Sequence, residues 1–259
     1  MNLAYLQVEN VSRYFGGIAA LRDVDFQVSQ GEIVGLIGPN GAGKTTLFNV
    51  ITGFSKPSRG RIVYEGRVIS DLAPHQIASM GIIRTYQKTS VFPALTVGQN
   101  ISIGHHQQSQ PGIGAVLFRT SAHHAERQET GARVDEILNF LAMAWAKDFI
   151  AQNLSYGDQR KLEIAIALSA RPKLLLLDEP AAGLNSEETE GLMAVIRKIQ
   201  GQGITILVVE HHMQLVMGIC ERIVVLNYGK KIAEGPPDQI QNDEEVIKVY
   251  LGEEVEDQP

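Results

Sequence analysis

The chain reads Gly38-Pro39-Asn40-Gly41-Ala42-Gly43-Lys44-Thr45 directly after an apolar run, Ile33-Val34-Gly35-Leu36-Ile37. This order predicts a buried strand, a glycine-rich turn and a helix that begins at Lys44. Backbone N–H groups, the positive end of the helix dipole and the Lys44 ammonium would converge on the β- and γ-phosphates of a nucleotide. The hydroxyl of Thr45 suits Mg²⁺, and Thr46, the next residue, is also expected to bind the nucleotide. The pattern therefore predicts that the chain binds a nucleoside triphosphate.

Length and charge limit the classes of protein to consider. The chain has 259 residues, 44% of them hydrophobic, which is enough for one large domain or for one domain with a subdomain. The formal net charge is −6, so no overall positive field attracts nucleic acid. Cys220 is the only cysteine, which rules out an intramolecular disulfide and indicates a reducing compartment.

The sequence carries no pattern of its own for entering a membrane. Residues 1–5 lack the basic and then apolar stretches of a signal peptide. The longest apolar runs, at 174–177 and 204–209, are the size of strands, whereas a membrane-spanning helix needs about 20 apolar residues. We therefore expect any role at a membrane to depend on a partner.

Strand and helix patterns alternate along most of the chain, which predicts an α/β fold with a mainly parallel sheet. The expected core elements are strands at 33–37, 82–85, 173–177, 204–209 and 223–226 and a helix through 192–199 that ends at Gly201. Alternating Val24, Phe26 and Val28 indicate a half-buried strand, and the segments around Glu65-Gly66 indicate a hairpin. These add an antiparallel β subdomain to the expected core.

The pattern changes between about residues 97 and 163, which predicts a helical subdomain inserted in the core. Thr96 and Gln99 have the spacing of a capping box, and residues 105–128 look irregular. An amphipathic helix is expected next, from apolar residues at Val134, Ile137, Leu138 and Leu141. We therefore expect a single domain over 1–259, with its core at about 1–96 and 164–240 and a C-terminal helix and acidic tail at 241–259.

Two carboxylates, Asp178 and Glu179, follow the apolar run Leu174-Leu175-Leu176-Leu177. The carboxyl ends of strands are where α/β sheets place ligands. Asp178 could hold Mg²⁺, and Glu179 could take a proton from an attacking water or orient it.

Ser155 can cap the helix that follows it, so this segment is another helix N-terminus with free N–H groups.

Taken together, these segments resemble the motifs of ABC-transporter ATPases. Gln87 follows a strand, Ser155-Tyr156-Gly157 begins a helix, and His211 follows Glu210 at the end of another strand. The order of phosphate loop, Gln87, signature segment, carboxylates and His211 is similar to that of the family over essentially the whole chain. Asn185 falls in the position of the family's D-loop, and Phe15 in that of the aromatic residue that stacks on adenine, with Tyr14 as the neighbouring alternative.

The resemblance implies a P-loop NTPase core and a role for each of these residues. Phe15, the phosphate loop from Gly38 to Thr46, and Ser155 with Gly157 would bind ATP. Glu179, His211 and Gln87 would be catalytic, and Thr45, Gln87 and Asp178 would hold Mg²⁺. Because Ser155 and Gly157 act on the nucleotide of the opposite subunit in this family, the site implies a dimer with a second ABC ATPase.

The chain departs from the common family pattern at Tyr156, Asp158, Asn185 and His212. Tyr156 and Asp158 leave Ser155 and Gly157 in place, so they bear on the rate of hydrolysis more than on hydrolysis itself. Some departures are informative. Four segments are similar to the ATPases of branched-chain (hydrophobic) amino acid importers: residues 84–87, 181–185 and 245–252, and the Tyr-Gly of the signature. Related systems move urea, short amides or aromatic acids, and the lipopolysaccharide-export ATPase has a similar C-terminal ending.

The resemblance predicts an ATP-hydrolysing subunit that dimerises on ATP and powers solute import, most simply of branched-chain amino acids. Its partners would be transmembrane permease subunits and, indirectly, a periplasmic or extracellular solute-binding protein, with no nucleic acid. It would lie peripherally on the cytoplasmic face of the inner membrane. The alternatives are a related urea, amide, aromatic-acid or lipopolysaccharide-export system, or a soluble ABC ATPase outside transport. The latter would have long coiled coils or a second phosphate loop, and neither is found in this sequence.

Overall fold

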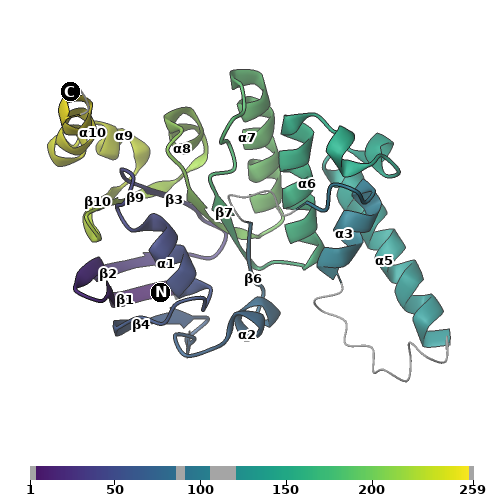
Figure 1. The fold of residues 1–259 in the computed structure, drawn as a ribbon, viewed down its shortest axis with the longest axis horizontal. Coiled ribbons are helices and arrows are strands. Elements are labelled where there is room, and N and C mark those ends of the chain that lie inside the picture. The colour runs from purple at the N-terminus through teal and green to yellow at the C-terminus, as the bar shows by residue number, and fades with distance from the viewer. Residues whose placement is uncertain (1–3, 86–90, 106–120, 257–259) are drawn as a thin grey trace. The chain divides into compact units, whose positions relative to one another are not determined.

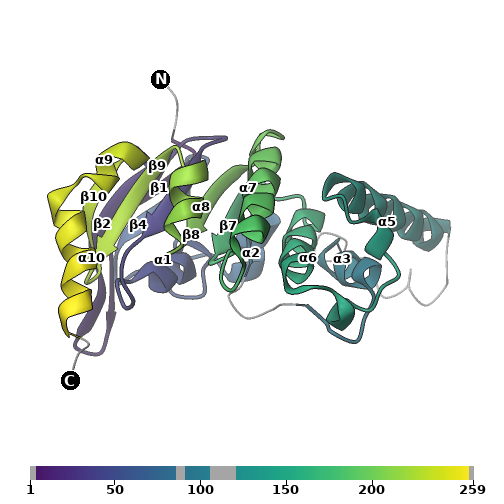
Figure 2. The ribbon, with the colours of Figure 1, turned by 90° about the horizontal axis from the view of Figure 1, so that it is seen from above.

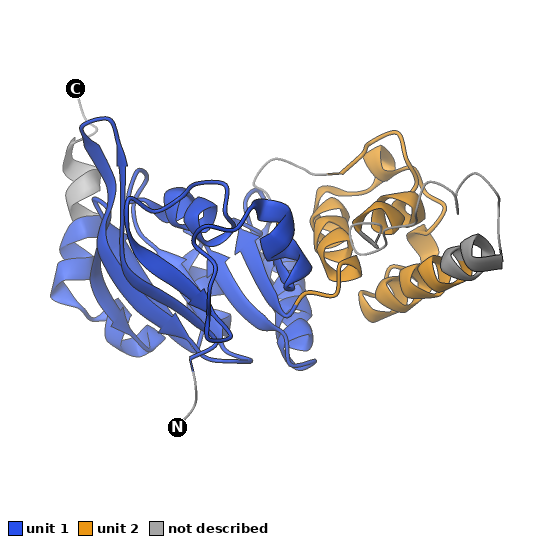
Figure 3. Cartoon of the chain, turned by 90° about the horizontal axis from the view of Figure 1, so that it is seen from below, with its two compact units in different colours: residues 1–84, 173–259 blue, residues 85–172 orange. Residues whose placement is uncertain are grey.

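The computed structural model describes residues 4–85, 91–105 and 121–256 in two compact units (Figure 3). Unit 1 comprises Met1–Arg84 and Lys173–Pro259, and unit 2 comprises Thr85–Pro172. The strands of unit 1 are β1 (Leu6–Phe15), β2 (Ile18–Val28), β3 (Ile33–Ile37), β4 (Arg59–Tyr64), β5 (Arg67–Val68), β6 (Ile82–Arg84), β7 (Leu174–Asp178), β8 (Thr205–Val209), β9 (Arg222–Asn227) and β10 (Lys230–Gly235). Its helices are α1 (Lys44–Ile51), α2 (Pro74–Ser79), α7 (Ser186–Gln200), α8 (Met213–Ile219), α9 (Pro237–Gln241) and α10 (Glu244–Glu256). Within the described ranges, none of the helices combines the length and the apolar character needed to cross a bilayer.

A mainly parallel sheet forms the centre of unit 1, as the alternating strand and helix patterns predict. Its strand order is β10-β9-β3-β8-β7-β6, and only β10 runs antiparallel to its neighbour. Val209 pairs with both Leu36 of β3 and Asp178 of β7. The carboxyl ends of β3, β7 and β8 therefore lie together at one edge of the sheet, where parallel sheets present ligand sites.

Both faces of this sheet are covered, which explains why its central strands are continuous apolar runs. Figure 1 shows α1 and the antiparallel strands on one face, and Figure 2 shows α7 and α8 over the other. Alternate strand residues such as Leu36, Leu176 and Leu207 are fully buried in one cluster with Leu47 and Phe48 of α1. Burying a side chain of this size stabilises the fold by about 1.5–3 kcal/mol, so α1 is held rigidly behind the phosphate loop.

The antiparallel sheet of unit 1 has the order β2-β1-β4-β5. Val24, Phe26 and Val28 of β2 are buried, as their alternation predicts. The expected hairpin is confirmed: Val63 pairs with Val68 around Glu65 and Gly66, whose φ angles are 48° and 75°. Positive φ at both central positions matches the right-handed twist of the flanking strands.

Unit 2 is helical and contains α3 (Val97–His105), α5 (Ser121–Phe140), α6 (Tyr156–Ser169) and the short 3₁₀ helices Ala144–Ala146 and Ala151–Asn153. The capping box is confirmed: the N–H of Thr96 donates to Gln99 Oε1 at 2.9 Å and that of Gln99 to Thr96 Oγ1 at 3.2 Å. The apolar side chains predicted for the amphipathic helix are buried: Val134, Ile137 and Leu138 on α5, and Leu141 directly after it. The irregular stretch predicted at 105–128 is wrong at both ends, because His105 belongs to α3 and residues 121–128 to α5. The polar composition of 121–128 gave no helical periodicity, so this part of the helix was not predicted. The rest of the predicted stretch, residues 106–120, lies outside the described residues.

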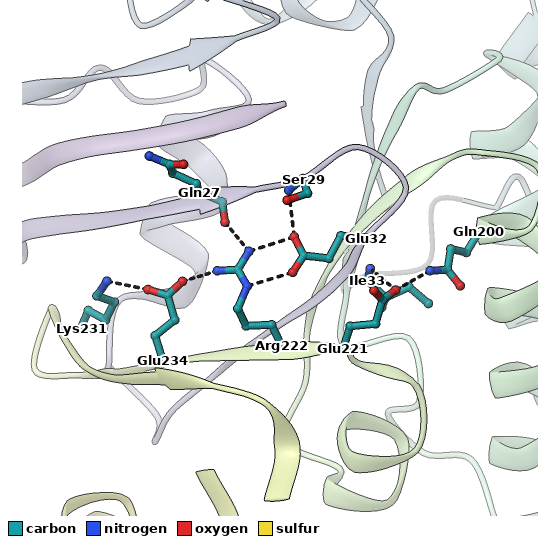
Figure 4. A network of polar contacts seen from close by, with 9 residues as sticks. All are labelled: Gln27, Ser29, Glu32, Ile33, Gln200, Glu221, Arg222, Lys231 and Glu234. Carbon is teal, nitrogen blue, oxygen red and sulfur yellow. Dashed lines mark hydrogen bonds and ion pairs between the residues drawn. The ribbon is translucent and has the colours of Figure 1, made fainter. Parts of the chain in front are cut away.

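A polar network fastens the edge of the parallel sheet opposite the strand ends described above (Figure 4). Arg222, the first residue of β9, donates to both carboxylate oxygens of Glu32 at 2.8 and 2.9 Å and to the Gln27 carbonyl at 2.6 Å. It also pairs with Glu234, which accepts from Lys231 at 2.6 Å. Burial alone would lower the pKa of Arg222, but the carboxylates of Glu32 and Glu234 raise it above its usual value. The guanidinium is therefore a permanent cation that joins β2, β9 and β10 to the segment before β3.

Candidate nucleotide-binding and hydrolysis site

The phosphate loop connects β3 to α1 and adopts a conformation that requires glycine. Gly38, Gly41 and Gly43 have φ angles of 147°, 79° and 105°. A Cβ on Gly38 would lie 2.1 Å from the Leu226 carbonyl oxygen, and one on Gly43 would lie 2.6 Å from that of Ala20. The loop is thus wedged between β9 and β2, and its backbone N–H groups at the start of α1 form a site for phosphate oxygens.

Lys44 lies at the first position of α1 and is only 8% exposed. Its ammonium folds back onto the loop and donates to the carbonyls of Gly38 at 2.6 Å and Pro39 at 2.9 Å. Asn40, Gly41 and Thr45 are exposed and Thr46 is partly exposed, whereas Pro39 and Ala42 are buried. The loop therefore presents a hydroxyl and backbone donors on its outer surface, with the lysine charge directly beneath.

Phe15 ends β1 and is half exposed, with the Arg13 guanidinium 4.6 Å from the centre of its ring. The β1–β2 hairpin that carries Phe15 leads into Ala20, which touches the phosphate loop at Gly43. Tyr14 beside it is 39% exposed. An exposed aromatic ring next to a phosphate site suits a nucleotide base, and Phe15 is the more exposed residue of the two.

Asp178 ends β7 and is paired with an arginine that the sequence reasoning did not single out as a site residue. Arg84 Nη2 lies 2.7 Å from Asp178 Oδ2, and both side chains are 5% exposed. Nη1 of Arg84 donates to Asn49 Oδ1 at 2.7 Å, and the guanidinium stacks 5.3 Å from the Phe48 ring. The available signal was positional: Arg84 ends β6, which pairs in parallel with β7.

Glu179 and His211 meet beside these strand ends. Nδ1 of His211 lies 3.9 Å from Oε1 of Glu179, which is longer than a hydrogen bond. The histidine side chain is 59% exposed and that of Glu179 is 18% exposed. The N–H of Glu179 donates to the Val209 carbonyl at 2.9 Å, which ties the end of β7 to the end of β8. An acid and an imidazole thus face solvent together, next to the phosphate loop in the sheet order. Gln87, the third expected catalytic residue, lies outside the described residues.

The signature segment begins α6 in unit 2. Ser155 caps the helix: its Oγ accepts from the N–H of Asp158 at 3.2 Å and donates to Asp158 Oδ2 at 2.8 Å. Gly157 is buried in the first turn. Tyr156, a departure from the family pattern, accepts a hydrogen bond from Arg160 Nη2 at 2.6 Å. Asp158 therefore supports the cap of α6, because both its N–H and its carboxylate bond to Ser155. Tyr156 is anchored to its own helix by Arg160.

Asn185 caps the N-terminus of α7 and forms a complete capping box with Glu188. Its Oδ1 accepts from the N–H of Glu188 at 2.9 Å, and Oε2 of Glu188 accepts from the N–H of Asn185 at 3.0 Å. An asparagine caps a helix as well as the usual aspartate does. This departure therefore preserves the local structure after Glu179 and removes a negative charge.

Comparison with known proteins identifies the family. The sequence model described as "ABC transporter" matches residues 21–182, and that described as "Branched-chain amino acid ATP-binding cassette transporter" matches residues 230–256. The chain is 43% identical to the high-affinity branched-chain amino acid transport ATP-binding protein LivG of Salmonella typhimurium, over 98% of this chain and 100% of that protein. It is 35% identical to the lipopolysaccharide export system ATP-binding protein LptB of Haemophilus influenzae, over 97% and 99% of the two chains.

Solved structures agree with the sequence comparison. The ADP conformation of an ATP-binding cassette of an ABC transporter superposes with a TM-score of 0.85 at 32% identity, covering 96% of this chain and 99% of that one. A dimeric bacterial ABC transporter cassette gives a TM-score of 0.74 at 26% identity, covering 90% and 98%. The expected fold, a P-loop core with an antiparallel β part and a helical part, is confirmed. The chain belongs to the ABC transporter family, as one of its ATP-binding, ATP-hydrolysing proteins.

Proposed function

We propose that this chain is the ATP-hydrolysing subunit of an importer for branched-chain amino acids and that it acts as a dimer. The observation that carries the proposal is the grouping of strand ends in unit 1: the phosphate loop after β3, the carboxylates at the end of β7, and His211 after β8. The cargo is supported by the 43% identity to LivG and by the match of residues 230–256 to the branched-chain family.

The residues divide the work by what they offer chemically. The phosphate loop, Gly38 to Thr46, binds the phosphates through backbone N–H groups and the Lys44 ammonium, and Phe15 stacks on the base. Glu179 takes a proton from the attacking water, or orients it. His211, whose Nδ1 lies 3.9 Å from Glu179 Oε1, donates a hydrogen bond to the γ-phosphate. The proposed role of Gln87, orienting that water, concerns a residue outside the described ranges.

The donors at these strand ends suit Mg²⁺, which prefers hard oxygen ligands. They are the hydroxyl of Thr45 and the carboxylate of Asp178, to which the sequence adds the amide oxygen of Gln87. When bound, the ion neutralises charge on the transferring phosphate. Before that, the Arg84 guanidinium supplies the positive charge next to Asp178, at 2.7 Å.

A dimer follows from where the signature segment lies in the chain. In the proposed assembly, Ser155 and Gly157 act on nucleotide held by the phosphate loop of a second ABC ATPase, identical or related. The dimeric cassette of the same fold supports this arrangement. Ser155→Arg should leave nucleotide binding to the monomer intact but prevent the ATP-dependent dimer, as measured by light scattering. Ser186→Arg, at the exposed start of α7, is the matched control. Unchanged dimerisation of the Ser155 variant would contradict the shared site.

The proposed membrane partners are transmembrane permease subunits, which place this chain peripherally on the cytoplasmic side of the inner membrane. A solute-binding protein would act on those permeases and not on this chain. Phe92, which is 52% exposed at the start of unit 2, is an apolar anchor for such a partner. Co-purification with the permeases should be lost in Phe92→Asp and kept in the control Asp148→Asn.

The rival functions predict different stimulation of the reconstituted transporter. If the proposal holds, leucine, isoleucine or valine with their binding protein should raise ATP hydrolysis, while urea, short amides, aromatic acids and lipopolysaccharide should not. Stimulation by one of the latter would reassign the cargo. ATP hydrolysis that no membrane complex alters would favour an ABC ATPase outside transport.

Glu179→Gln tests the hydrolytic site itself. The variant should lose at least about 10²-fold in turnover, a typical contribution of a general base, and should accumulate as the ATP-bound dimer. Glu190→Gln, an exposed glutamate on α7, is the control and should hydrolyse ATP as the wild type does. Near-normal turnover of Glu179→Gln would remove Glu179 as the base.

A further inference from the structure

Glu210 is a fully buried carboxylate next to the hydrolytic residues, and the roles proposed above do not use it. It follows β8 directly, precedes His211, and has 0% relative exposure. Its Oε1 accepts from the N–H of Ala181 at 2.7 Å. Its Oε2 accepts from the N–H groups of His211 at 2.9 Å and His212 at 3.0 Å. One side chain thus receives hydrogen bonds from two different segments of backbone.

These segments carry the residues that act on water and phosphate. Ala181 lies in the turn after β7, two residues beyond Glu179, and this turn is closed by a hydrogen bond from the N–H of Ala182 to the Glu179 carbonyl at 3.1 Å. Glu179 has a φ of 50°, in the left-handed region that is unfavourable for a non-glycine residue. Such a conformation persists only where its surroundings hold it, and the bonds to Val209 and from Ala181 to Glu210 do so.

We propose that Glu210 is a positioning residue for ATP hydrolysis, whose carboxylate sets the backbone of Glu179 and of His211 relative to each other. The inference rests on the proposed function of those two residues. Glu210 contacts neither the nucleotide nor the water. It acts by fixing where the Glu179 and His211 side chains begin, so that their ends stay 3.9 Å apart at the same edge of the sheet.

The chemistry of the contact explains why a carboxylate stands at this position. All three partners are N–H donors, and an ionised carboxylate is a pure acceptor with a site for each. Hydrogen bonds to a charged group are roughly twice as strong as neutral ones. A glutamine of the same shape has one accepting oxygen and an NH₂ group that faces a donor. It would keep the pair of bonds at His211 and His212 and lose the bond to Ala181, which releases the Glu179 turn.

Glu210→Gln in the full chain is the test. The variant should bind ATP with a dissociation constant within about twofold of wild type, because the phosphate loop is untouched, while kcat falls at least about tenfold. The fall should disappear in the Glu179→Gln background, since a residue that acts through Glu179 has nothing left to position. Asp243→Asn is the matched control: its carboxylate also accepts backbone N–H groups, those of Glu245 at 2.9 Å and Val246 at 3.0 Å, but away from the hydrolytic residues.

A second measurement, amide hydrogen exchange, begins with the wild-type protein. The amides of Ala181, His211 and His212 should exchange slowly there, because each donates to Glu210. In Glu210→Gln, exchange at Ala181 should speed up most. Unprotected amides in the wild type, an unchanged kcat in Glu210→Gln, or a loss that adds fully to that of Glu179→Gln would each overturn the inference. Should Glu179→Gln itself retain turnover, the proposed function fails instead, which separates the two outcomes.

Discussion

Replacing Arg84 by methionine should destabilise unit 1 because it breaks a buried ion pair from one side. The Arg84 and Asp178 side chains are 2.7 Å apart and each is 5% exposed. Methionine keeps the length and most of the packing on Phe48 but removes the charge next to the carboxylate. Asp178 then keeps a buried negative charge without its guanidinium partner.

The size of the effect can be worked from this burial. Removing one member of a buried ion pair costs about 3–5 kcal/mol, whereas removing both charges is close to neutral. We expect a loss of about 3 kcal/mol for Arg84→Met and for Asp178→Asn, and roughly 1 kcal/mol for the double variant. For a protein of this size, about 3 kcal/mol lowers Tm by roughly 6–12 °C.

The assay is urea and thermal unfolding of the wild type, the two single variants and the double variant, monitored by far-ultraviolet circular dichroism. Tryptophan fluorescence is unsuitable, since Trp145 lies in unit 2 and Arg84 in unit 1. Arg61→Met is the control, because its pair with Glu9 is exposed at 59% and 29% and should contribute no more than about 1 kcal/mol. The buried pair is not what stabilises this end of the sheet if Arg84→Met and Arg61→Met lower the free energy of unfolding equally. The same conclusion follows if the losses in free energy of Arg84→Met and Asp178→Asn simply add in the double variant.

The remaining predictions concern the phosphate loop, the cysteine and a buried tyrosine. Gly38→Ala should abolish binding of a fluorescent ATP analogue, because its Cβ would lie 2.1 Å from a β9 carbonyl oxygen, in addition to about 1–3 kcal/mol of backbone strain. Gly41→Ala, with open space around its Cβ, should bind more weakly than wild type but still bind, and equal binding by both variants would contradict the steric argument. Burial raises the pKa of the Cys220 thiol to about 12, so Ellman's reagent should react only as the protein unfolds; rapid reaction of the native protein at pH 8 would refute this. Burial also raises the pKa of Tyr64. The unfolded state therefore loses its proton first, and stability should be intact below about pH 10 and fall as pH rises above it. Tyr64→Phe should reduce the slope of Tm between pH 9 and 11, and an unchanged slope would assign the alkaline loss to other groups.

Most of the fold was predictable because its signals are local. The run Ile33 to Ile37 followed by Gly38 to Thr45 predicts a strand, a loop and a helix from an apolar run and glycine spacing that can be read within one short segment. The stretch at 121–128 was missed for the same reason. Its polar residues give no periodic signal, and a helix stabilised further along its length extends through them.

The residues of the candidate site differ in the same way: some could be named from the local sequence and others could not. Asp178, Glu179 and His211 could be named from the sequence, since each follows a strand-like apolar run. Arg84 and Glu210 could not be assigned to the site, because their importance comes from partners far along the chain: Asp178 for Arg84, and Ala181 for Glu210. Nothing in the local sequence tells a buried, bonded carboxylate from an exposed one.

The sequence by itself determined the phosphate loop and the order of the motifs, and these in turn determined the family. Only the tertiary structure decided that β3, β7 and β8 end side by side, that Arg84 neutralises Asp178, and that Glu210 joins the Glu179 turn to His211. The physical reason is that the phosphate-loop motif is a contiguous pattern of residue types, whose glycines permit its backbone conformation. Burial and charge pairing depend on which strands the sheet brings together.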